Sequence, residues 1–179
     1  MSRRLLTCLV ACLVVGLVAA GCAPRQSRDQ YQERLTAAVE IRTSTSTALT
    51  DHTFANAAAY DTAAQQVASA MDELDADQPP RGLGDAHDRM LAGLDGLQAL
   101  LSRLGRCEAL AANSAQDARA CRQSITQDVY DEIRNDFSEA DTIYRQEGLS
   151  LPGLGEEGEG AGTVDRGDVL DEPTSANEE

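Results

Sequence analysis

The sequence MLAGLDGLQALLSRLG, at residues 90–105, is the most leucine-rich stretch of the chain beyond its N-terminal segment. Its large apolar residues recur every three or four positions, which is the spacing of one face of an α-helix. They are Met90, Leu94, Leu97, Leu101 and Leu104, with Leu91 and Leu100 widening the stripe. The pattern predicts a helix over about residues 85–104, ended at Gly105 by a left-handed cap. A face this apolar must pack against other helices.

The segment before residue 50 has a helical pattern with a weak second half. Ser27 and Gln30 have the spacing of a capping box, so a first helix is expected over residues 28–49. Its stripe consists of Tyr31, Leu35, Ala38 and Ile41. Residues 43–47 are all Thr or Ser, whose hydroxyls compete for backbone groups, so this half is expected to bend, fray or form the connecting loop.

Two further segments repeat the helical spacing. A second helix is expected over residues 53–75 and must stop before Pro79 and Pro80, because proline cannot continue the backbone hydrogen bonding. Its stripe consists of Tyr60, Ala64, Val67, Met71 and Leu74. A last helix is expected over residues 114–147, closed by Gly148. Its stripe consists of Cys121, Ile125, Val129, Ile133, Phe137, Ala140 and Tyr144.

These patterns together predict the fold class. No segment after the N-terminal region alternates apolar and polar residues as a half-buried strand does. Helices joined by short connections favour antiparallel neighbours, so the predicted fold is all-α, an up-down antiparallel four-helix bundle over residues 28–148. If the first two helices merge into one, the same sequence forms three long helices instead.

The composition changes sharply after the last predicted helix. Residues 155–179 hold nine acidic residues, five glycines and one arginine. Such a segment cannot bury enough apolar surface to offset the entropy lost when it becomes ordered. Residues 149–179 are therefore expected to be a disordered acidic, Gly-rich tail that acts as a spacer or solubilising segment.

The N-terminus has the parts of an export signal in the expected order. Arg3 and Arg4 precede an apolar run over residues 5–20, which is short for a membrane span. Residues 17–22 follow with the sequence LVAAGC, in which small residues precede a cysteine. This segment resembles the signal peptides of bacterial lipoproteins, with residues 17–22 as the lipobox.

The resemblance implies both a modification and a location. Residues 1–21 are expected to be a signal peptide that is removed, and Cys22 to carry lipid, with palmitate among its acyl chains. Residues 22–27 are then a short tether between the lipid and the helical domain. The protein is expected at the cell membrane, lipid-anchored and facing the extracytoplasmic side.

The five cysteines divide by position. Cys8 and Cys12 lie in the apolar run and leave with the signal peptide, while Cys22 is taken by lipid. Cys107 and Cys121 remain, fourteen positions apart. In an oxidising extracytoplasmic compartment such a pair predicts a disulfide, which is expected to clamp the end of the third helix to the start of the fourth.

A second resemblance concerns the part of the chain after the signal peptide. Residues 79–148 combine a Pro-Pro break, a leucine-rich helix, two cysteines and a final amphipathic helix. In this they resemble small uncharacterised helical lipoproteins of actinobacteria. All fifteen basic residues are arginine and none is lysine, a composition typical of the GC-rich genomes of that group. The likeness implies no catalytic residues.

Few side chains suggest chemistry. His52 and His87 are the only histidines, and neither lies in a hydrolase, metalloprotease or phosphate-binding motif. His87, beside the stripe of the third helix, is interpreted as a core-edge or surface residue rather than a ligand. An acidic group before the Pro-Pro break does not match a calcium loop and is interpreted as a solvated helix end. It comprises Asp72, Glu73, Asp75 and Asp77. No catalytic, cofactor-binding or metal-ligating residue is predicted.

The function follows from location and charge more than from motifs. A formal net charge of −15 argues against nucleic acid and against an anionic lipid surface as a partner. The predicted function is that of a non-enzymatic helical interaction or accessory module at the cell envelope, held to the membrane through Cys22. The alternative is a small-ligand or metal-binding carrier that uses the bundle interior, and an enzyme ranks third.

The predicted partner of such a module is another envelope protein. The stripe of the first helix is thinner than the others, so this helix is expected to pack loosely. The apolar faces of the third and fourth helices are then open to another protein's helix, the helix-in-groove mode of recognition. The competing interpretation is an inert bundle that serves as a spacer.

Overall fold

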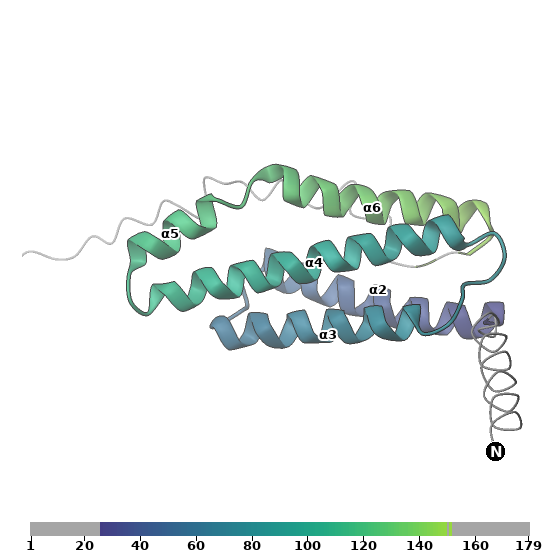
Figure 1. Ribbon diagram of the computed structural model, residues 1–179, viewed down its shortest axis with the longest axis horizontal. Helices are drawn as coiled ribbons and strands as arrows, with labels where there is room; N and C mark the ends of the chain where they lie inside the picture. The colour runs from purple at the N-terminus through teal and green to yellow at the C-terminus, as the bar shows by residue number, and fades with distance from the viewer. Residues whose placement is uncertain (1–25, 150, 152–179) are drawn as a thin grey trace, which may run out of the picture.

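The computed structural model describes residues 26–149 and 151. All regular secondary structure in these residues is helical, which confirms the predicted all-α class (Figure 1). None of the described helices is long and apolar enough to cross a membrane. The predicted signal peptide, Cys22 and most of the predicted tail lie outside the described residues. The helices are α2 (Arg28–Thr50), α3 (Ala57–Asp75), α4 (Gly84–Ala111), α5 (Ala115–Gln123) and α6 (Gln127–Gln146).

Helix α4 occupies the centre of this helical body. It packs against α3 on one side and α6 on the other, while α2 packs along α3 and the short α5 packs on α4 (Figure 1). The predicted leucine stripe forms the middle of the core, where Met90, Leu94, Leu97 and Leu101 are all buried. The leucine-rich stretch of residues 90–105 therefore lies in the helix that contacts three of the other four described helices, α3, α5 and α6.

Two glycines of α4 allow α6 to approach closely. A Cβ atom at Gly93 would lie 2.8 Å from the ring of Phe137, and one at Gly96 would lie 2.8 Å from Cγ1 of Ile133. Any larger residue would push α6 away. Each glycine costs helix stability of about 1 kcal/mol relative to alanine, and the burial of Phe137 against the exposed helix backbone offsets that cost.

The prediction that the third helix ends at Gly105 is wrong, because α4 continues to Ala111. Gly105 is buried within the helix, and a Cβ atom there would lie 3.1 Å from Cβ of Tyr60. The glycine thus lets the start of α3 approach α4 instead of ending a helix. The sequence does not separate these two uses, because both depend on the missing Cβ.

The prediction of one helix over residues 114–147 is also wrong, because the chain divides into α5 and α6 around Ser124. The hydroxyl of Ser124 donates to the carbonyl of Cys121 at 2.6 Å, and the carbonyl of Ser124 accepts from Nη2 of Arg103 at 2.9 Å. After this break the side chain of Ile125 packs in a small apolar cluster with Cys107. The apolar stripe continues through the break, so its periodicity did not reveal it.

Helix α2 continues unbroken through residues 43–47 to Thr50, where a bend, fraying or a loop was predicted. Within this stretch the hydroxyl of Ser44 donates to the carbonyl of Ile41 at 3.0 Å, whereas the hydroxyl of Thr43 is buried without a hydrogen-bond partner among the described residues. Neither hydroxyl draws the backbone into another conformation. Tertiary packing of the helix overrides its low intrinsic propensity.

The turn between α2 and α3 spans residues 51–56 and keeps the two helices separate, so the alternative of three long helices is wrong. His52 adopts a left-handed backbone conformation there, with φ of 52°, and its side chain is exposed. Asn56 then caps α3 by accepting from the N–H of Ala59 at 3.0 Å. His52 thus belongs to a surface turn.

The end of α6 is closed by Gly148, as predicted. Gly148 has φ of 76°, and the N–H of Leu149 donates to the carbonyl of Tyr144 at 2.8 Å, which together with the bond from Gly148 to Arg145 forms a Schellman motif. Leu149 and Leu151 were assigned to the tail, yet each is 3% exposed and belongs to the main core cluster. The folded body therefore includes them.

Candidate functional site

Four polar side chains meet at the end of the body where α2 and α4 begin and where α3 and α6 end. Tyr31 is in the first turn of α2, His87 in the first turn of α4, Asp75 is the last residue of α3, and Tyr144 lies in the last turn of α6. Figure 1 shows these four helix ends on the same side of the body. We call this group the tyrosine–histidine network.

The network is a continuous chain of hydrogen bonds. The hydroxyl oxygens of Tyr144 and Tyr31 are 2.7 Å apart, and the Tyr31 oxygen lies 3.2 Å from Nδ1 of His87. On the other side of the imidazole ring, Nε2 lies 3.4 Å from Oδ1 of Asp75. The chain therefore runs from a fully buried phenol to a carboxylate that is largely exposed.

The chemistry of the groups sets the direction of each hydrogen bond. An ionised carboxylate can only accept, so Nε2 of His87 donates to Asp75. In the neutral imidazole Nδ1 then accepts, and the hydroxyl of Tyr31 donates to it. The Tyr31 oxygen is left to accept from the hydroxyl of Tyr144. Every polar hydrogen of this chain thus has an acceptor, as buried polar groups require.

Burial holds both phenols in their protonated form. Desolvation is the largest cause that raises the pKa of Tyr31 to about 12, and the negative charge of Asp88 adds to it, while the hydrogen bond with Tyr144 acts in the opposite direction. Desolvation is likewise the first cause that raises the pKa of Tyr144, followed by the influence of Tyr31. Both side chains remain hydrogen-bond donors at any physiological pH and are poor nucleophiles.

Whether the tyrosine–histidine network can take part in a reaction depends on whether a substrate can reach its side chains. A carboxylate, an imidazole and a hydroxyl in sequence have the order of a catalytic triad, but general acid–base chemistry needs contact with a reacting group. Tyr31, His87 and Tyr144 are all buried. The network therefore has the properties of a structural device, in which one polar side chain from each of four helices specifies how the helix ends meet.

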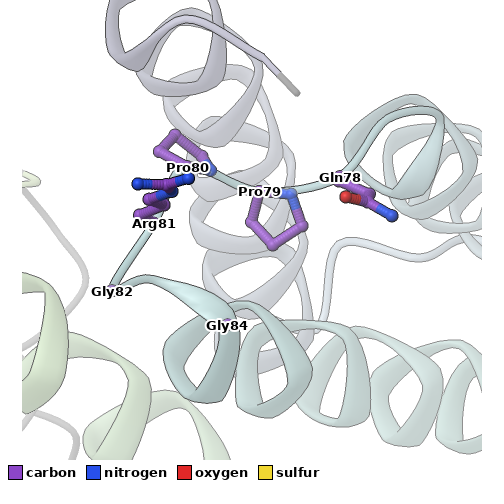
Figure 2. A pocket seen from close by; sticks show the side chains of 6 residues that line it. All are labelled: Gln78, Pro79, Pro80, Arg81, Gly82 and Gly84. Atoms are coloured by element: carbon purple, nitrogen blue, oxygen red, sulfur yellow. The ribbon is translucent and has the colours of Figure 1, made fainter. Parts of the chain in front are cut away.

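A shallow hollow of about 370 Å³ lies on the neighbouring connection between α3 and α4. Figure 2 shows its side chains spread along the loop, with Gln78 and Arg81 at opposite sides rather than converging on one point. It is lined by Gln78, Pro79, Pro80, Arg81, Gly82 and Gly84. None of the network residues lines it, so this hollow gives no access to His87.

His87 was interpreted as a core-edge or surface residue, and it is not on the surface, because it is 3% exposed and hydrogen-bonded at both ring nitrogens. Asp75, assigned to a solvated helix end, is its partner. The neighbouring Asp77 pairs with Arg34, Oδ2 to Nη1 at 3.2 Å. Asp72 and Glu73 are exposed, as expected of a helix end. Within residues 26–149 and 151, no three His, Cys, Asp or Glu side chains gather as metal ligands would.

Cys107 and Cys121 are joined in a disulfide, with Cα atoms 5.3 Å apart. Cys107 lies inside α4, and Cys121 lies in α5 rather than in the last long helix. The bond therefore clamps α5 back onto the final turns of α4. An ion pair between Arg122 and Glu108 at 2.8 Å lies beside it.

Sequence reasoning missed the network because it counted Tyr31 and Tyr144 only as apolar stripe residues. A signal was present, since a buried tyrosine hydroxyl usually finds a partner. Tyr31, His87 and Tyr144 all lie within one turn of a predicted helix end, and an up-down arrangement brings those ends together. Three polar-tipped residues at matching ends would have indicated a shared interaction.

Comparison with known proteins found no match: no protein-family model, no curated protein and no solved structure matches this chain. The geometry of the chain's own residues is therefore the basis for its function. Two features stand out in it, the hydrogen-bonded end at the tyrosine–histidine network and the disulfide-clamped end at α5.

Proposed function

We propose that this protein is a lipid-anchored lipoprotein of the extracytoplasmic face of the cell membrane, and that its body, an up-down four-helix bundle, is a non-enzymatic interaction module. The observation that carries the proposal is the position of Gln26. This residue is buried, and its N–H donates to the carbonyl of Gln78 at 3.2 Å, next to the tyrosine–histidine network. The first described residue is thus fixed by a hydrogen bond to the connection between α3 and α4.

The distance from Gln26 to Cys22 supports a close attachment to the membrane. Four residues span at most about 14 Å when fully extended. Lipid on Cys22 would therefore keep the network end of the body near the bilayer. The hydrogen bonds that join four helices at this end suit a point where the anchor transmits force to the domain.

The opposite end is the one that a partner can reach. Helix α4 has 28 residues, so its far end lies about 40 Å from its start. At that far end Leu110 is 40% exposed, and it is the one exposed large hydrophobic side chain of the described part of the chain. The disulfide between Cys107 and Cys121 stiffens the same end. We assign contact with another envelope protein to this disulfide-clamped end.

This proposal differs from docking on an open groove between the third and fourth predicted helices. The core-facing side chains of α4 and α6, such as Leu97 and Phe137, are buried in the structure. A partner helix would reach them only if α2 moved away. Contact at Leu110 requires no such movement and therefore suits the free protein better.

Site-specific photo-crosslinking in intact envelopes tests the module. A photoreactive amino acid at Leu110 is expected to give a discrete adduct with another envelope protein. The same amino acid at Ala99, an exposed position midway along α4, is the matched control and is expected to give none. No adduct from position 110, or equal adducts from both positions, would contradict the assignment.

Cell fractionation tests the anchor separately. Cys22→Ala is expected to abolish lipid attachment and to shift the protein out of the membrane fraction or leave it unprocessed. Two acyl chains hold a protein to the bilayer, and each buried methylene contributes about 0.8 kcal/mol. A variant that is processed and sediments with membranes as before would show that Cys22 is not the anchor.

A further inference from the structure

Positive charge gathers at the disulfide-clamped end of a strongly acidic chain. Residues 99–124, which run from the second half of α4 to the end of α5, hold four arginines and two acidic residues. The other described residues hold seven arginines and nineteen acidic residues. Figure 1 shows the positive segment at the end of the body where α4 meets α5. Its arginines are Arg103, Arg106, Arg119 and Arg122.

Two of these arginines share one face of α4 with the exposed leucine. Arg103, Arg106 and Leu110 are spaced i, i+3 and i+7, which places them within about 60° around the helix axis. Leu110 is 40% exposed, Arg106 is exposed, and Arg103 is half-buried. We call these three residues the arginine–leucine patch.

The break between α5 and α6 fixes one arginine of the patch. Nη2 of Arg103 donates to the carbonyl oxygen of Ser124 at 2.9 Å and to its hydroxyl at 3.0 Å. A guanidinium has five N–H groups, so those on Nε and Nη1 are left for a ligand. Ser124 is three residues from Cys121, whose disulfide ties this segment to α4. The side chain is therefore preorganised, which lowers the entropic cost of binding.

Among the described residues, neither arginine of the patch has a carboxylate partner. Arg89, earlier on α4, pairs with Asp136 and with Glu139, each at 2.9 Å. No acidic residue lies three or four positions from Arg103 or Arg106. Like charges this close on one helix repel each other, so the patch suits a negatively charged partner. The described arginines that pair with carboxylates are Arg34, Arg89, Arg122, Arg134 and Arg145.

We propose that the arginine–leucine patch binds an acidic peptide segment of the partner protein, with two carboxylates for Arg103 and Arg106 and an apolar side chain for Leu110. This inference rests on the proposed contact at the disulfide-clamped end and names the chemistry of what binds there. Arginine and carboxylate form strong, charge-assisted hydrogen bonds. The apolar side chain removes part of Leu110 from water.

The dimensions of the patch favour a short stretch of peptide. Arg103 and Leu110 are about 10 Å apart along the helix axis, the length of about three extended residues. An acidic pair beside an apolar residue therefore covers the patch. A polyanion without apolar groups would leave Leu110 exposed. A lipid headgroup is disfavoured by position, because α4 places this end about 40 Å from the end near the anchor.

Binding of a synthetic peptide with two glutamates beside one leucine tests the patch directly. Fluorescence anisotropy measures its affinity for the full-length chain in detergent. Arg106→Gln is expected to weaken binding about fivefold, the effect of one ion pair on a protein surface. Arg81→Gln is the matched control, since Arg81 is exposed, has no carboxylate partner among the described residues and lies at the other end. It is expected to change nothing.

Three outcomes of this measurement would overturn the proposal. One is the absence of peptide binding to the unmodified chain. Another is an equal affinity of Arg106→Gln and the unmodified chain, or an equal loss in Arg81→Gln. The third is equal binding of a peptide that has serine in place of leucine, because the patch would then take any polyanion.

Photo-crosslinking at Leu110 in intact envelopes separates this proposal from the proposed function. Sequencing of the cross-linked peptide by mass spectrometry is expected to find two acidic residues within about three positions of the attached residue. Adding Arg106→Gln should lower the yield of the adduct about fivefold, whereas Arg81→Gln should not. An adduct with a neutral or basic segment would overturn acidic recognition and keep the contact at this end. The absence of any adduct would contradict the proposed function and this proposal with it.

Discussion

At the end of the body where α2 begins, four helices are joined by hydrogen bonds between Tyr31, Tyr144, His87 and Asp75, whereas at the other end α5 is tied to α4 by a disulfide. The first kind of contact is directional and depends on which group holds each proton. The second is covalent, and it is surrounded by a small apolar cluster around Leu100. The two ends should therefore respond to different perturbations, pH at the network and reducing agents at the disulfide.

The largest expected effect is alkaline loss of stability at the network end. The pKa of Tyr31 is raised to about 12 in the folded protein and is about 10 in an unfolded chain. Between these pH values the unfolded chain releases a proton from Tyr31 that the folded protein keeps. The contribution of Tyr31 to the free energy of unfolding is therefore complete below pH 10 and is lost as the pH rises through about 12. Two pKa units correspond to about 3 kcal/mol from Tyr31 alone, and the raised pKa of Tyr144 increases the loss.

Urea unfolding measured from pH 9 to 12 gives the slope of the free energy of unfolding against pH directly. Tyr31→Phe is expected to flatten it, because the variant has no hydroxyl to titrate at this position. Tyr130→Phe is a useful comparison, since the pKa of Tyr130 is also raised by burial but its hydroxyl lies outside the network. A slope that Tyr31→Phe leaves unchanged would show that the network does not control alkaline stability.

Loss of the disulfide should have the second largest effect on stability and should act on the end where α5 packs on α4. Changing Cys107 and Cys121 to alanine is expected to lower the free energy of unfolding by about 3 kcal/mol, because the bond restricts the unfolded chain. Hydrogen exchange should then rise in α5 and in the last turns of α4, with little change around Tyr31. Equal loosening at both ends would mean that the two regions are not independent.

Single hydroxyl deletions within the network should give smaller and graded effects. Tyr31→Phe removes the hydroxyl that bonds both Tyr144 and His87, and is expected to cost about 2 kcal/mol because two buried groups lose their partner. Tyr144→Phe removes only the first donor of the chain and should cost about 1 kcal/mol. Denaturant midpoints of the two variants give the comparison. The reverse order would contradict the position of Tyr31 in the middle of the chain, with partners on both sides.

Features that depend on near neighbours in the chain were predicted well. The leucine stripe of α4 is buried, the capping box at Ser27 starts α2, and Gly148 closes α6. Caps and stripes involve residues within a few positions of each other, so their energetics are already present in the local sequence. The pairing of Cys107 with Cys121 belongs to this group, because their separation is short and the competing cysteines lie in the N-terminal segment.

Features that depend on how helices meet were not predictable from periodicity. Gly105 resembled a cap but allows contact with Tyr60, and Ser124 interrupts a stripe that looks continuous. His87 was placed at the edge of the core, although its partners Tyr31 and Asp75 bury and satisfy it. These roles depend on groups brought together by packing, at distances along the chain of up to 113 residues in the network. A hydrogen bond between helices is formed only when their relative height and rotation are established, and a helical stripe specifies neither.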